Sequence, residues 1–450
     1  MSKSKKVVFA TMPNDKCPKD WRAPDYYKTV IDPAKHMPLG ILSLATNLKP
    51  GHEVKIIDAR SDRFTLEETI HRIEQEKPDV LGITAQSMRA YALKEILQKT
   101  SVPYKVVVGG HANEHPELIL SQGADAVLVG QLVDVEFRDA VETMPKGIIR
   151  CNKTKFENIK FPDRTFVDDY RTYFPKDFVF FKTKNRLHMI SSVGCYQHCN
   201  FCYMPFHKMK RKTPPATVDE MQHLYNLGAR SVHILDDNFV VSAGWLNEVM
   251  DEMDKRNFSV EWSGRGEIRM DDGLAKRMYE HGFKRIHAGI EAIDDNILKN
   301  FFKKNSSEKR IYEFCNTMNR NNIDVLGFFI IGTPLETEEY LDALPGKIKN
   351  LGIKHPYIQI LSPTPHTEYY RDLVTQGIFK KDYWREYFEN PVPDFQIPSP
   401  HSTERLRELR ERVDSIEKEY VLGNLDGDGA SMDNLEGIGV NVNLHHQRAC

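Results

Sequence analysis

The sequence predicts an α/β chain with an N-terminal doubly wound parallel sheet, a partial (β/α)6 barrel after it, and a helical C-terminal segment. Three observations lead to this prediction. Short β-rich runs alternate with amphipathic segments over the first third of the chain, strand-like runs recur from Leu187 onward, and a cysteine group follows the first of these later runs. At 450 residues the chain is long enough for two or three domains. We expect domains over residues 1–145 and 187–370, a linker over 146–186, and helices with a flexible tail over 371–450.

Composition limits the class of protein. The formal net charge is −2, which gives no general electrostatic footprint for nucleic acid, so no nucleic-acid partner is expected. No apolar run approaches the ~18 residues of a membrane helix, and no signal-peptide core follows the N-terminus, so no membrane span is expected. The 7 cysteines are odd in number and mostly scattered, which argues against a disulfide framework and favours a cytoplasmic location.

Five strand-like and five helical segments alternate in the N-terminal third, which predicts parallel pairing with ligands beyond the carboxyl ends of the strands. The strands are expected at Val7–Ala10, Val54–Asp58, Val80–Thr84, Lys105–Gly109 and Ala126–Val129. The helices are expected at Leu39–Leu48, Leu66–Glu76, Ala90–Lys99, Pro116–Ser121 and Val135–Thr143. Thr65, with Glu67 and Glu68 after it, is typical of a helix start.

The ends of the last three of these strands carry glycines and polar side chains. Glycine allows a backbone to approach a large ligand closely, and hydroxyl groups bind its polar edges. A glycine at a strand–helix turn is also ordinary turn chemistry, so no single residue identifies a site. The candidates are Thr84, Ser87, Gly109, Gly110, His111, Gly130, Gln131 and Leu132.

Three cysteines, Cys195, Cys199 and Cys202, fall within eight residues. Three thiolates on a short loop can hold three corners of an iron–sulfur cluster and leave one iron without a protein ligand. Closed structural metal sites usually use four ligands, so the missing fourth indicates that the open corner has a function. The alternatives are a zinc site with a distant fourth ligand, such as His198 or His207, and a chance cluster.

Six further strand-like runs predict an open parallel barrel, whose chemistry is expected at the carboxyl ends of the strands. They are Leu187–Val193, Ser231–Leu235, Ser259–Ser263, Arg285–Ile290, Val325–Ile331 and Tyr357–Leu361. Polar residues follow several of them: Asp236, Asp237, Arg265, Glu291, Glu336 and His366. A guanidinium such as that of Arg265 can bind a carboxylate through two parallel hydrogen bonds. Glu336, or Thr333 near it, could instead cap the next helix.

Fewer features can be predicted for the C-terminal segment, residues 371–450. Asp382–Tyr387 suggests a short aromatic helix, and Arg405–Tyr420 has apolar residues at helical spacing, so we expect a surface helix on the barrel. From Gly423 the composition predicts a flexible tail. The tail carries His445, His446 and Cys450, which are more often inert there than metal ligands.

The cysteine spacing resembles that of the radical S-adenosylmethionine (SAM) enzymes, and the N-terminal third resembles the cobalamin-binding domain that precedes many of them. The stretches that carry the second resemblance are Met37–Ala45, Lys77–Thr84 with Ser87, Val106–His111 and Gly123–Gly130. The resemblance implies a [4Fe-4S] cluster on the three cysteines, with SAM on its open iron, and cobalamin at the N-terminal strand ends. It places Phe201 beside the adenine, Asp236 and Asp237 at the amino group, Arg265 at the carboxylate, and Glu291 at the ribose or the amine of SAM.

Three departures qualify the resemblance. The D-x-H-x-x-G motif that supplies an axial histidine in classical cobalamin enzymes is absent, and Asp58-Ala-Arg-Ser-Asp-Arg stands near its place, so no such histidine would bind the cobalt. Gly130-Gln-Leu-Val-Asp replaces the usual glycine followed closely by glutamate. His366 stands where the family commonly has glycine, and it is either an imidazole near the substrate or a surface variant. The N-terminal domain could therefore also serve packing or another ligand.

The resemblance implies a cobalamin-dependent radical SAM methyltransferase. In such enzymes a 5′-deoxyadenosyl radical takes hydrogen from an unactivated carbon, and methylcobalamin delivers the methyl group. The expected partners are a substrate, either a peptide or a small molecule, and an external electron donor such as flavodoxin or ferredoxin. The alternatives are oxidative cyclisation or rearrangement with the same cofactors, a radical SAM enzyme without cobalamin, and a non-enzymatic iron–sulfur carrier or interaction module.

Overall fold

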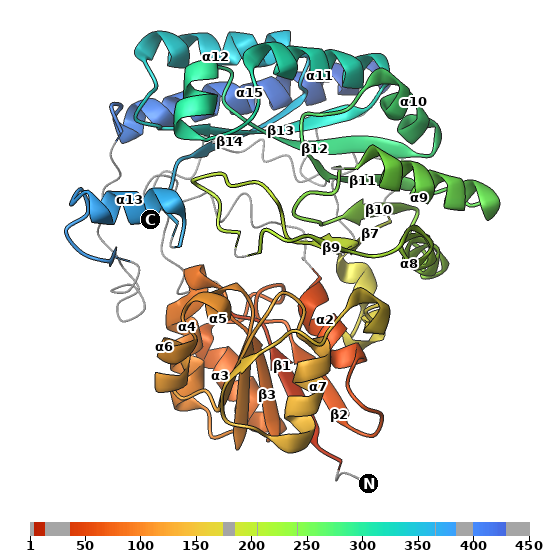
Figure 1. The fold of residues 1–450 in the computed structure, drawn as a ribbon, viewed down its shortest axis with the longest axis vertical. Coiled ribbons are helices and arrows are strands. Elements are labelled where there is room, and N and C mark those ends of the chain that lie inside the picture. Colours follow the sequence, from red (N-terminus) through yellow and green to blue (C-terminus); the bar gives the residue numbers. More distant parts are fainter. Residues whose placement is uncertain are drawn as a thin grey trace.

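The computed structural model describes residues 4–13, 37–173, 185–204, 206–240, 242–364, 366–383 and 399–428. They form two units, each built on a parallel sheet. In Figure 1 the N-terminal unit lies below and the second unit lies above it. The predicted α/β fold class is confirmed.

All neighbouring strands of the first sheet are parallel, in the order β2-β1-β3-β4-β5-β6. The five predicted strands are present, and a sixth, β6, comes from the segment expected to be a linker. The strands are β1 Lys6–Ala10, β2 Glu53–Ile57, β3 Val80–Thr84, β4 Tyr104–Val108, β5 Ala126–Val129 and β6 Gly147–Arg150. The order is that of flavodoxin-like doubly wound sheets, which place ligands beyond the carboxyl edge at the strand-order switch.

The helices of the first unit cover both faces of its sheet (Figure 1). They are α2 Leu39–Thr46, α3 Leu66–Glu76, α4 Ala90–Lys99, α5 Gly110–Glu114, α6 Pro116–Ser121 and α7 Asp134–Thr143, with the short turn η1 Ser87–Arg89. The start of α3 is a capping box, in which Thr65 accepts from the Glu68 amide at 3.1 Å and Glu68 accepts from the Thr65 amide at 2.8 Å. Helix α5 was not predicted.

The second sheet is also parallel throughout, in the order β14-β13-β12-β11-β10-β7. Its six predicted strands are all present: β7 Arg186–Met189, β10 Ser231–Ile234, β11 Glu261–Gly266, β12 Phe283–Glu291, β13 Asp324–Ile331 and β14 His355–Ile360. Strands β7 and β14 stand at opposite edges, so the sheet is an open, partial barrel. A short antiparallel hairpin, β8 Ser192–Val193 with β9 Lys210–Arg211, follows β7.

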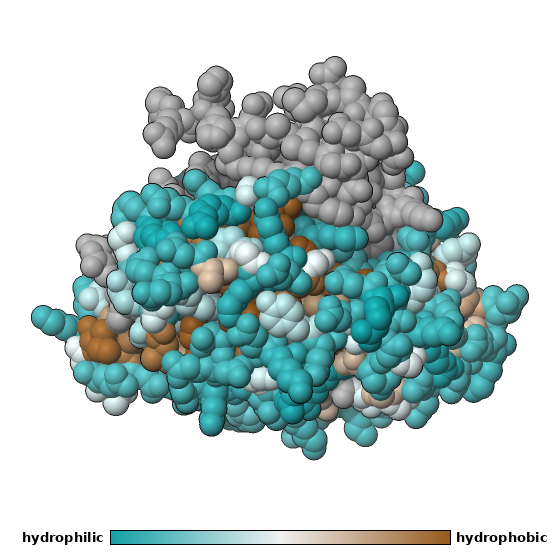
Figure 2. All heavy atoms as spheres, turned by 90° about the horizontal axis from the view of Figure 1, so that it is seen from above, coloured by the Kyte–Doolittle hydropathy of each residue, from teal (hydrophilic) through white to brown (hydrophobic). Residues whose placement is uncertain are grey.

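The helices of the second unit follow its strands in turn. They are α8 Pro214–Asn226, α9 Ala243–Lys255, α10 Asp272–Glu280, α11 Glu308–Arg320, α12 Glu338–Asn350, α13 Glu368–Thr375 and α15 Thr403–Asp428, with the π-helical turn η5 Ile297–Phe301. Their polar sides face outward, and the face over α11 and α12 is mainly hydrophilic (Figure 2). Among the described helices, none has both the length and the apolar character that crossing a membrane requires.

Helix α15 is the C-terminal surface helix that the sequence predicts. It contacts β14 and α12 and buries Leu406, Leu409 and Val413. The helix continues through Gly423 to Asp428, although a tail was predicted from Gly423. Residues 384–398 and 429–450 lie outside the described part of the chain, and with them most of the predicted aromatic helix and the predicted tail residues His445, His446 and Cys450.

A buried arginine anchors the segment between the two sheets to the second unit. It contains the turns η2 Phe156–Asn158, η3 Arg164–Phe166 and η4 Tyr170–Tyr173. The Arg164 guanidinium donates to the His188 carbonyl of β7 at 2.8 Å and lies 3.9 Å from the Glu220 carboxylate. Lys212 also pairs with Glu220. Because burial of an unpaired charge is costly, these contacts fix where the first unit's chain enters the barrel.

The turn after β13 buries an acid. The carboxylate of Glu336 accepts from the Gly332 amide at 2.7 Å and is 4% exposed. The cap of α12 is Thr337, whose hydroxyl accepts from the Tyr340 amide, so neither Glu336 nor Thr333 is the capping residue. Burial raises the pKa of Glu336 to about 7.

This pKa predicts a pH dependence of stability. The folded state holds the Glu336 proton up to about pH 7, whereas a glutamate in an unfolded chain loses it near pH 4.3. Stability from this group is therefore present at low pH and is lost as the pH rises through this window. In urea unfolding between pH 4.5 and 7, the free energy of unfolding of the Glu336→Gln variant should fall less steeply with pH than that of wild type. Glu404→Gln, at an exposed acid of α15, should keep the wild-type slope, and equal slopes in all three proteins would contradict the assignment.

Candidate active site

A cavity of about 850 Å³ opens at the carboxyl ends of the second sheet and is lined by most of the residues predicted to hold the cluster and SAM. All three cysteines line it, and so do Phe201, Asp237, Arg265 and Glu291. Side chains that the sequence analysis did not assign also line it, notably Asn238, Glu267, His287, Lys304, Phe328, Tyr357 and Gln359. The predicted strand ends therefore converge on one space, as expected for a parallel barrel.

The cysteine loop folds back on itself between β8 and β9. The Cys195 amide donates to the Phe206 carbonyl at 3.2 Å, and the Cys202 amide donates to the Cys199 carbonyl at 3.0 Å. Gly194, at φ +90°, opens the loop, and a Cβ there would lie 2.5 Å from Nε2 of Gln131 and 2.9 Å from the Lys208 carbonyl. Only glycine fits this position without displacing its neighbours.

The adjacent acids after β10 have separate roles. Asp236 is 1% exposed and lies outside the residues that line the cavity. It accepts from the Ser191 amide at 2.6 Å and from the Ser192 hydroxyl at 2.6 Å, and burial raises its pKa. Asp237 lines the cavity and accepts from the Gly194 amide at 3.0 Å. Asp236 thus positions the chain that leads into the cysteine loop, and Asp237 is the acid available to a ligand.

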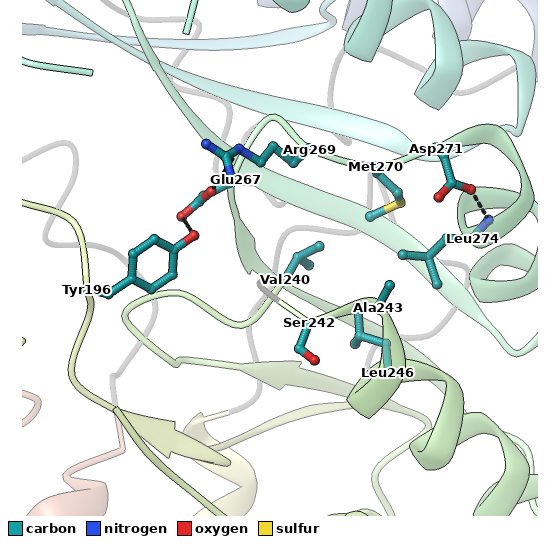
Figure 3. Close-up of a pocket in the computed structure, with 10 residues that line it drawn as sticks. All are labelled: Tyr196, Val240, Ser242, Ala243, Leu246, Glu267, Arg269, Met270, Asp271 and Leu274. Carbon is teal, nitrogen blue, oxygen red and sulfur yellow. Dashed lines mark hydrogen bonds and ion pairs between the residues drawn. The ribbon is translucent and has the colours of Figure 1, made fainter. Parts of the chain in front are cut away.

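Glu267 connects the cysteine loop to strand β11. Its Oε1 accepts from the side-chain amide of Gln197 at 2.7 Å, from the side-chain amide of Asn238 at 2.8 Å and from the Tyr196 hydroxyl. Figure 3 shows Tyr196, Glu267 and Arg269 beside a second cavity of about 360 Å³ that adjoins the first. The sequence signal for Glu267 was its place two residues after Arg265 in the same strand-end stretch.

Two oppositely charged groups face the cavity from β11 and β12. Arg265 is exposed, and within the described ranges no hydrogen bond or ion pair engages its guanidinium. Glu291 has φ +64° and pairs with Lys304 Nζ at 2.8 Å. Lys304 also donates to the Gly289 carbonyl at 2.6 Å. The strained backbone and the ion pair hold the Glu291 carboxylate in one orientation. No pattern in the sequence pointed to Lys304, since it lies in an ordinary charged stretch.

Phe201 provides an apolar wall beside the last cysteine. Its ring packs edge-on against Phe302 at a centroid distance of 5.2 Å. Another part of the cavity wall comes from β12, β13 and β14, where His287, Phe328 and Tyr357 stand. Phe328 contacts His287 and Tyr357 at centroid distances of 6.1 Å and 5.5 Å.

The predicted residues at the N-terminal strand ends lie where the first unit meets the cysteine loop. The side-chain amide of Gln131 donates to the Val193 carbonyl at 2.9 Å and to the Lys208 carbonyl at 3.0 Å. Tyr203, directly after Cys202, donates to the Gly110 carbonyl at 2.9 Å. The sequence analysis missed this role of Tyr203. The carboxyl edge of the first sheet therefore contacts the loop that carries the cysteines.

Packing explains the two other glycine positions among these candidates. Gly109 has φ +105°, and a Cβ there would lie 2.8 Å from the Ala85 carbonyl. A Cβ at Gly130 would lie 2.7 Å from the Cys151 Cβ. Thr84 and Leu132 are partly exposed at this edge and so remain accessible to a ligand, whereas His111 is buried with its Nδ1 3.2 Å from the Ser87 hydroxyl.

The donor set fits the implied cofactors. Thiolates are the usual ligands of iron–sulfur clusters, and burial raises the pKa of Cys199 to about 11, so a bound cation is what would keep this group ionised. The alternative zinc ligands His198 and His207 stack on each other with ring centroids 4.0 Å apart, and neither lines the cavity that the three cysteines line. The first sheet presents hydroxyls and close-approach glycines, as a large polar cofactor requires.

Comparison with known protein families identifies two domains. The B12 binding domain matches residues 33–135, and the Radical SAM superfamily matches residues 189–344. An uncharacterized methyltransferase of Pyrococcus horikoshii is 26% identical over 379 residues, which is 78% of this chain and 81% of that protein. The bacteriochlorophyllide d C-12(1)-methyltransferase of Chlorobaculum tepidum is 22% identical over 358 residues, 76% of this chain and 74% of that protein.

Solved structures share the fold. The radical S-adenosylmethionine methyltransferase TsrM from Kitasatospora setae, with tryptophan substrate and a SAM analog bound, aligns with a TM-score of 0.63 at 16% identity, over 82% of this chain and 76% of that chain. The cobalamin-dependent S-adenosylmethionine radical enzyme OxsB, with aqua-cobalamin bound, aligns with a TM-score of 0.56 at 14% identity, over 92% of this chain and 62% of that chain. The chain thus combines the two predicted domains in the predicted order.

The cysteine assignment predicts a specific loss of iron. Replacing Cys195, Cys199 and Cys202 by alanine should abolish iron and sulfide loading during anaerobic reconstitution, because no other group in the cavity supplies thiolate ligands. Iron analysis and the visible absorption of the cluster measure this. Cys315→Ala, at a buried cysteine of α11, is the matched control and should load iron as wild type does. Full loading of the triple variant would disprove the assignment.

Proposed function

The chain belongs to the radical SAM enzymes that carry a B12-binding domain, and on this basis we propose that it is a cobalamin-dependent radical SAM methyltransferase acting on an unactivated carbon. One observation carries the proposal. The loop with the three cysteines lines a cavity shared with Arg265 and Glu291, and the same loop contacts the carboxyl edge of the B12-binding domain through Tyr203. Relatives named as methyltransferases, including two for bacteriochlorophyllide d, support methyl transfer as the reaction.

The cofactors are a [4Fe-4S] cluster, SAM and cobalamin, and when bound they supply the electron, the radical precursor and the methyl group. Cys195, Cys199 and Cys202 hold the cluster. The unengaged guanidinium of Arg265 binds the SAM carboxylate through parallel hydrogen bonds. Lys304 fixes the Glu291 carboxylate, which accepts from the ribose hydroxyls or the amine of SAM.

Three further residues complete the proposed site. Asp237 accepts from the SAM amino group, while Asp236 holds the chain segment behind it. Phe201, backed by Phe302, lies against the adenine. A flat apolar surface and fixed polar groups exclude water and restrict the orientation of the bound molecule.

The substrate is proposed to occupy the side of the cavity formed by β12, β13 and β14. His287, Phe328, Tyr357 and Gln359 line it there. Burial keeps the pKa of His287 well below its ordinary value, so its ring is neutral and offers one donor and one acceptor to a substrate. These residues lie outside the set proposed for SAM and so are free to determine substrate choice.

The reaction needs a one-electron reductant of low potential. We propose flavodoxin or ferredoxin for this role and the cytoplasm as its location, where such carriers and an oxygen-sensitive cluster are protected from oxidation. We propose either a peptide or a small molecule as the substrate.

Methyl transfer predicts a defined set of products. Anaerobic incubation of the cluster- and cobalamin-loaded enzyme with reductant, methyl-deuterated SAM and candidate substrates should give 5′-deoxyadenosine, methionine, S-adenosylhomocysteine and a deuteromethylated product. Mass spectrometry identifies each of them. The cysteine triple variant is the negative control. Formation of 5′-deoxyadenosine with a modified but unmethylated product would instead establish cyclisation or rearrangement.

The role of Arg265 predicts weaker SAM binding in its variants. Arg265→Gln should raise the dissociation constant of SAM by about 10- to 100-fold, since hydrogen bonds to charged groups contribute about 1.5–3 kcal/mol. Equilibrium dialysis on the cluster-loaded protein measures this. Arg269→Gln is the matched control, because Arg269 lines the same cavity but pairs with Glu267 at 3.5 Å. An equal effect of both substitutions would indicate general charge attraction and contradict a direct contact.

A further inference from the structure

Three histidines converge where the two units meet, outside the cavity described above. His111 and His115 belong to the first unit, and His366 follows β14 of the second. Their ligand atoms all lie within 4.8 Å of one another. The rings of His115 and His366 are 4.3 Å apart between centroids, and those of His111 and His115 are 5.1 Å apart.

Local structure brings His111 and His115 to one side of a helical turn. The His115 amide donates to the His111 carbonyl at 3.0 Å, so the two residues are separated by one turn of helix. Residues four apart on a helix project side by side. Two histidines at this spacing are a common way for a helix to present two ligands to one metal ion.

His366 is held in a conformation that few histidines adopt. Its φ is +69°, in the left-handed region where glycine is favoured. Such backbone strain persists where the surrounding structure fixes it, and it is concentrated at functional positions. The Nε2 of His366 is buried and has no hydrogen-bond partner among the described residues. A buried ring nitrogen of this kind is suited to a ligand that accepts its lone pair.

Neighbouring polar groups orient these rings as the outer partners of metal ligands do. The Ser87 hydroxyl lies 3.2 Å from Nδ1 of His111, and the Glu114 carboxylate lies 3.5 Å from Nδ1 of His366. Glu114 in turn accepts from the Tyr203 hydroxyl at 3.0 Å. Hydroxyls and carboxylates behind imidazole ligands fix the ring orientation and the tautomer.

We infer that His111, His115 and His366 form a binding site for a divalent transition-metal ion of the zinc type, which joins the B12-binding domain to the loop after β14. The site is separate from the cysteines, and it shares His111 with the residues predicted at the carboxyl edge of the B12-binding domain. Three imidazoles are a ligand set that zinc accepts, with a fourth position open to water.

The geometry requires only small movements. Imidazole nitrogens at about 2.0–2.1 Å from a tetrahedral zinc ion are about 3.3 Å apart. The ligand atoms lie within 4.8 Å of one another, so side-chain rotations that move each ring by about 1 Å bring them to this spacing without moving the strands. Because the three ligands come from both units, a bound ion also fixes the units relative to one another.

The test uses the full chain, expressed without cobalamin and with Cys195, Cys199 and Cys202 replaced by alanine, so that neither the cluster nor the cysteines bind metal. Zinc analysis after dialysis should give one ion per chain, and Co2+ should give the visible absorption of a low-coordinate cobalt site. His366→Gly should weaken Zn2+ binding by about 100-fold or more, since even loss of an outer partner costs about 10- to 100-fold.

The choice of variants separates ligand loss from misfolding. Glycine accepts the φ of +69° at position 366, so the metal-free His366→Gly protein should melt no lower than its parent. His71→Gln, at an exposed histidine of α3, should bind zinc as the parent does. Glu114→Gln should weaken zinc binding by about 10- to 100-fold.

Cluster-loaded enzyme with intact cysteines provides a second measurement. It should bind one zinc ion beyond its iron, and His366→Gly should lose only that ion. Zinc well below one equivalent, or equal binding in the parent and in His366→Gly, would overturn the site. The site would be equally overturned if the histidine substitutions changed only the absorption spectrum of added cobalamin, because the imidazoles would then belong to the corrin site.

Discussion

The carboxyl edges of two parallel sheets meet in this protein, and the candidate site depends on that contact. Parallel strands direct their most variable loops to one edge, so two such edges face to face place many polar side chains in a small volume. Gln131 and Tyr203 make the contact with hydrogen bonds to backbone carbonyls across it. Buried amides and hydroxyls are costly when unpaired, so these bonds specify how the edges fit together.

Side chains from several elements hold the cysteine loop from different directions. Asp236 anchors the chain before it, Asp237 accepts from the Gly194 amide, and Glu267 holds Gln197 within the loop. Charge-assisted hydrogen bonds are short and directional, which suits them to fixing a loop that has little regular structure of its own. A site held in this way loses less conformational entropy when its ligands bind.

Particular elements show what could be predicted from the sequence. The strands of both sheets other than β6 could be predicted because strands buried on both faces form continuous apolar runs. Strand β6 (Gly147–Arg150) was missed because it is a short, partly exposed edge strand, and α5 (Gly110–Glu114) because it has no apolar period. The end of α15 was placed too early, since the glycines after Leu422 do not stop that helix.

The sequence by itself determined the two domains, the cysteine group and the strand ends that carry the other candidate residues, because these depend on spacing and periodicity within short stretches. Only the tertiary structure decided that Asp236 anchors while Asp237 faces the cavity, that Lys304 pairs with Glu291, and that His366 meets two histidines of the other unit. Such contacts join loops from different strands and different sheets. They depend on the packing of whole elements, which no local pattern encodes.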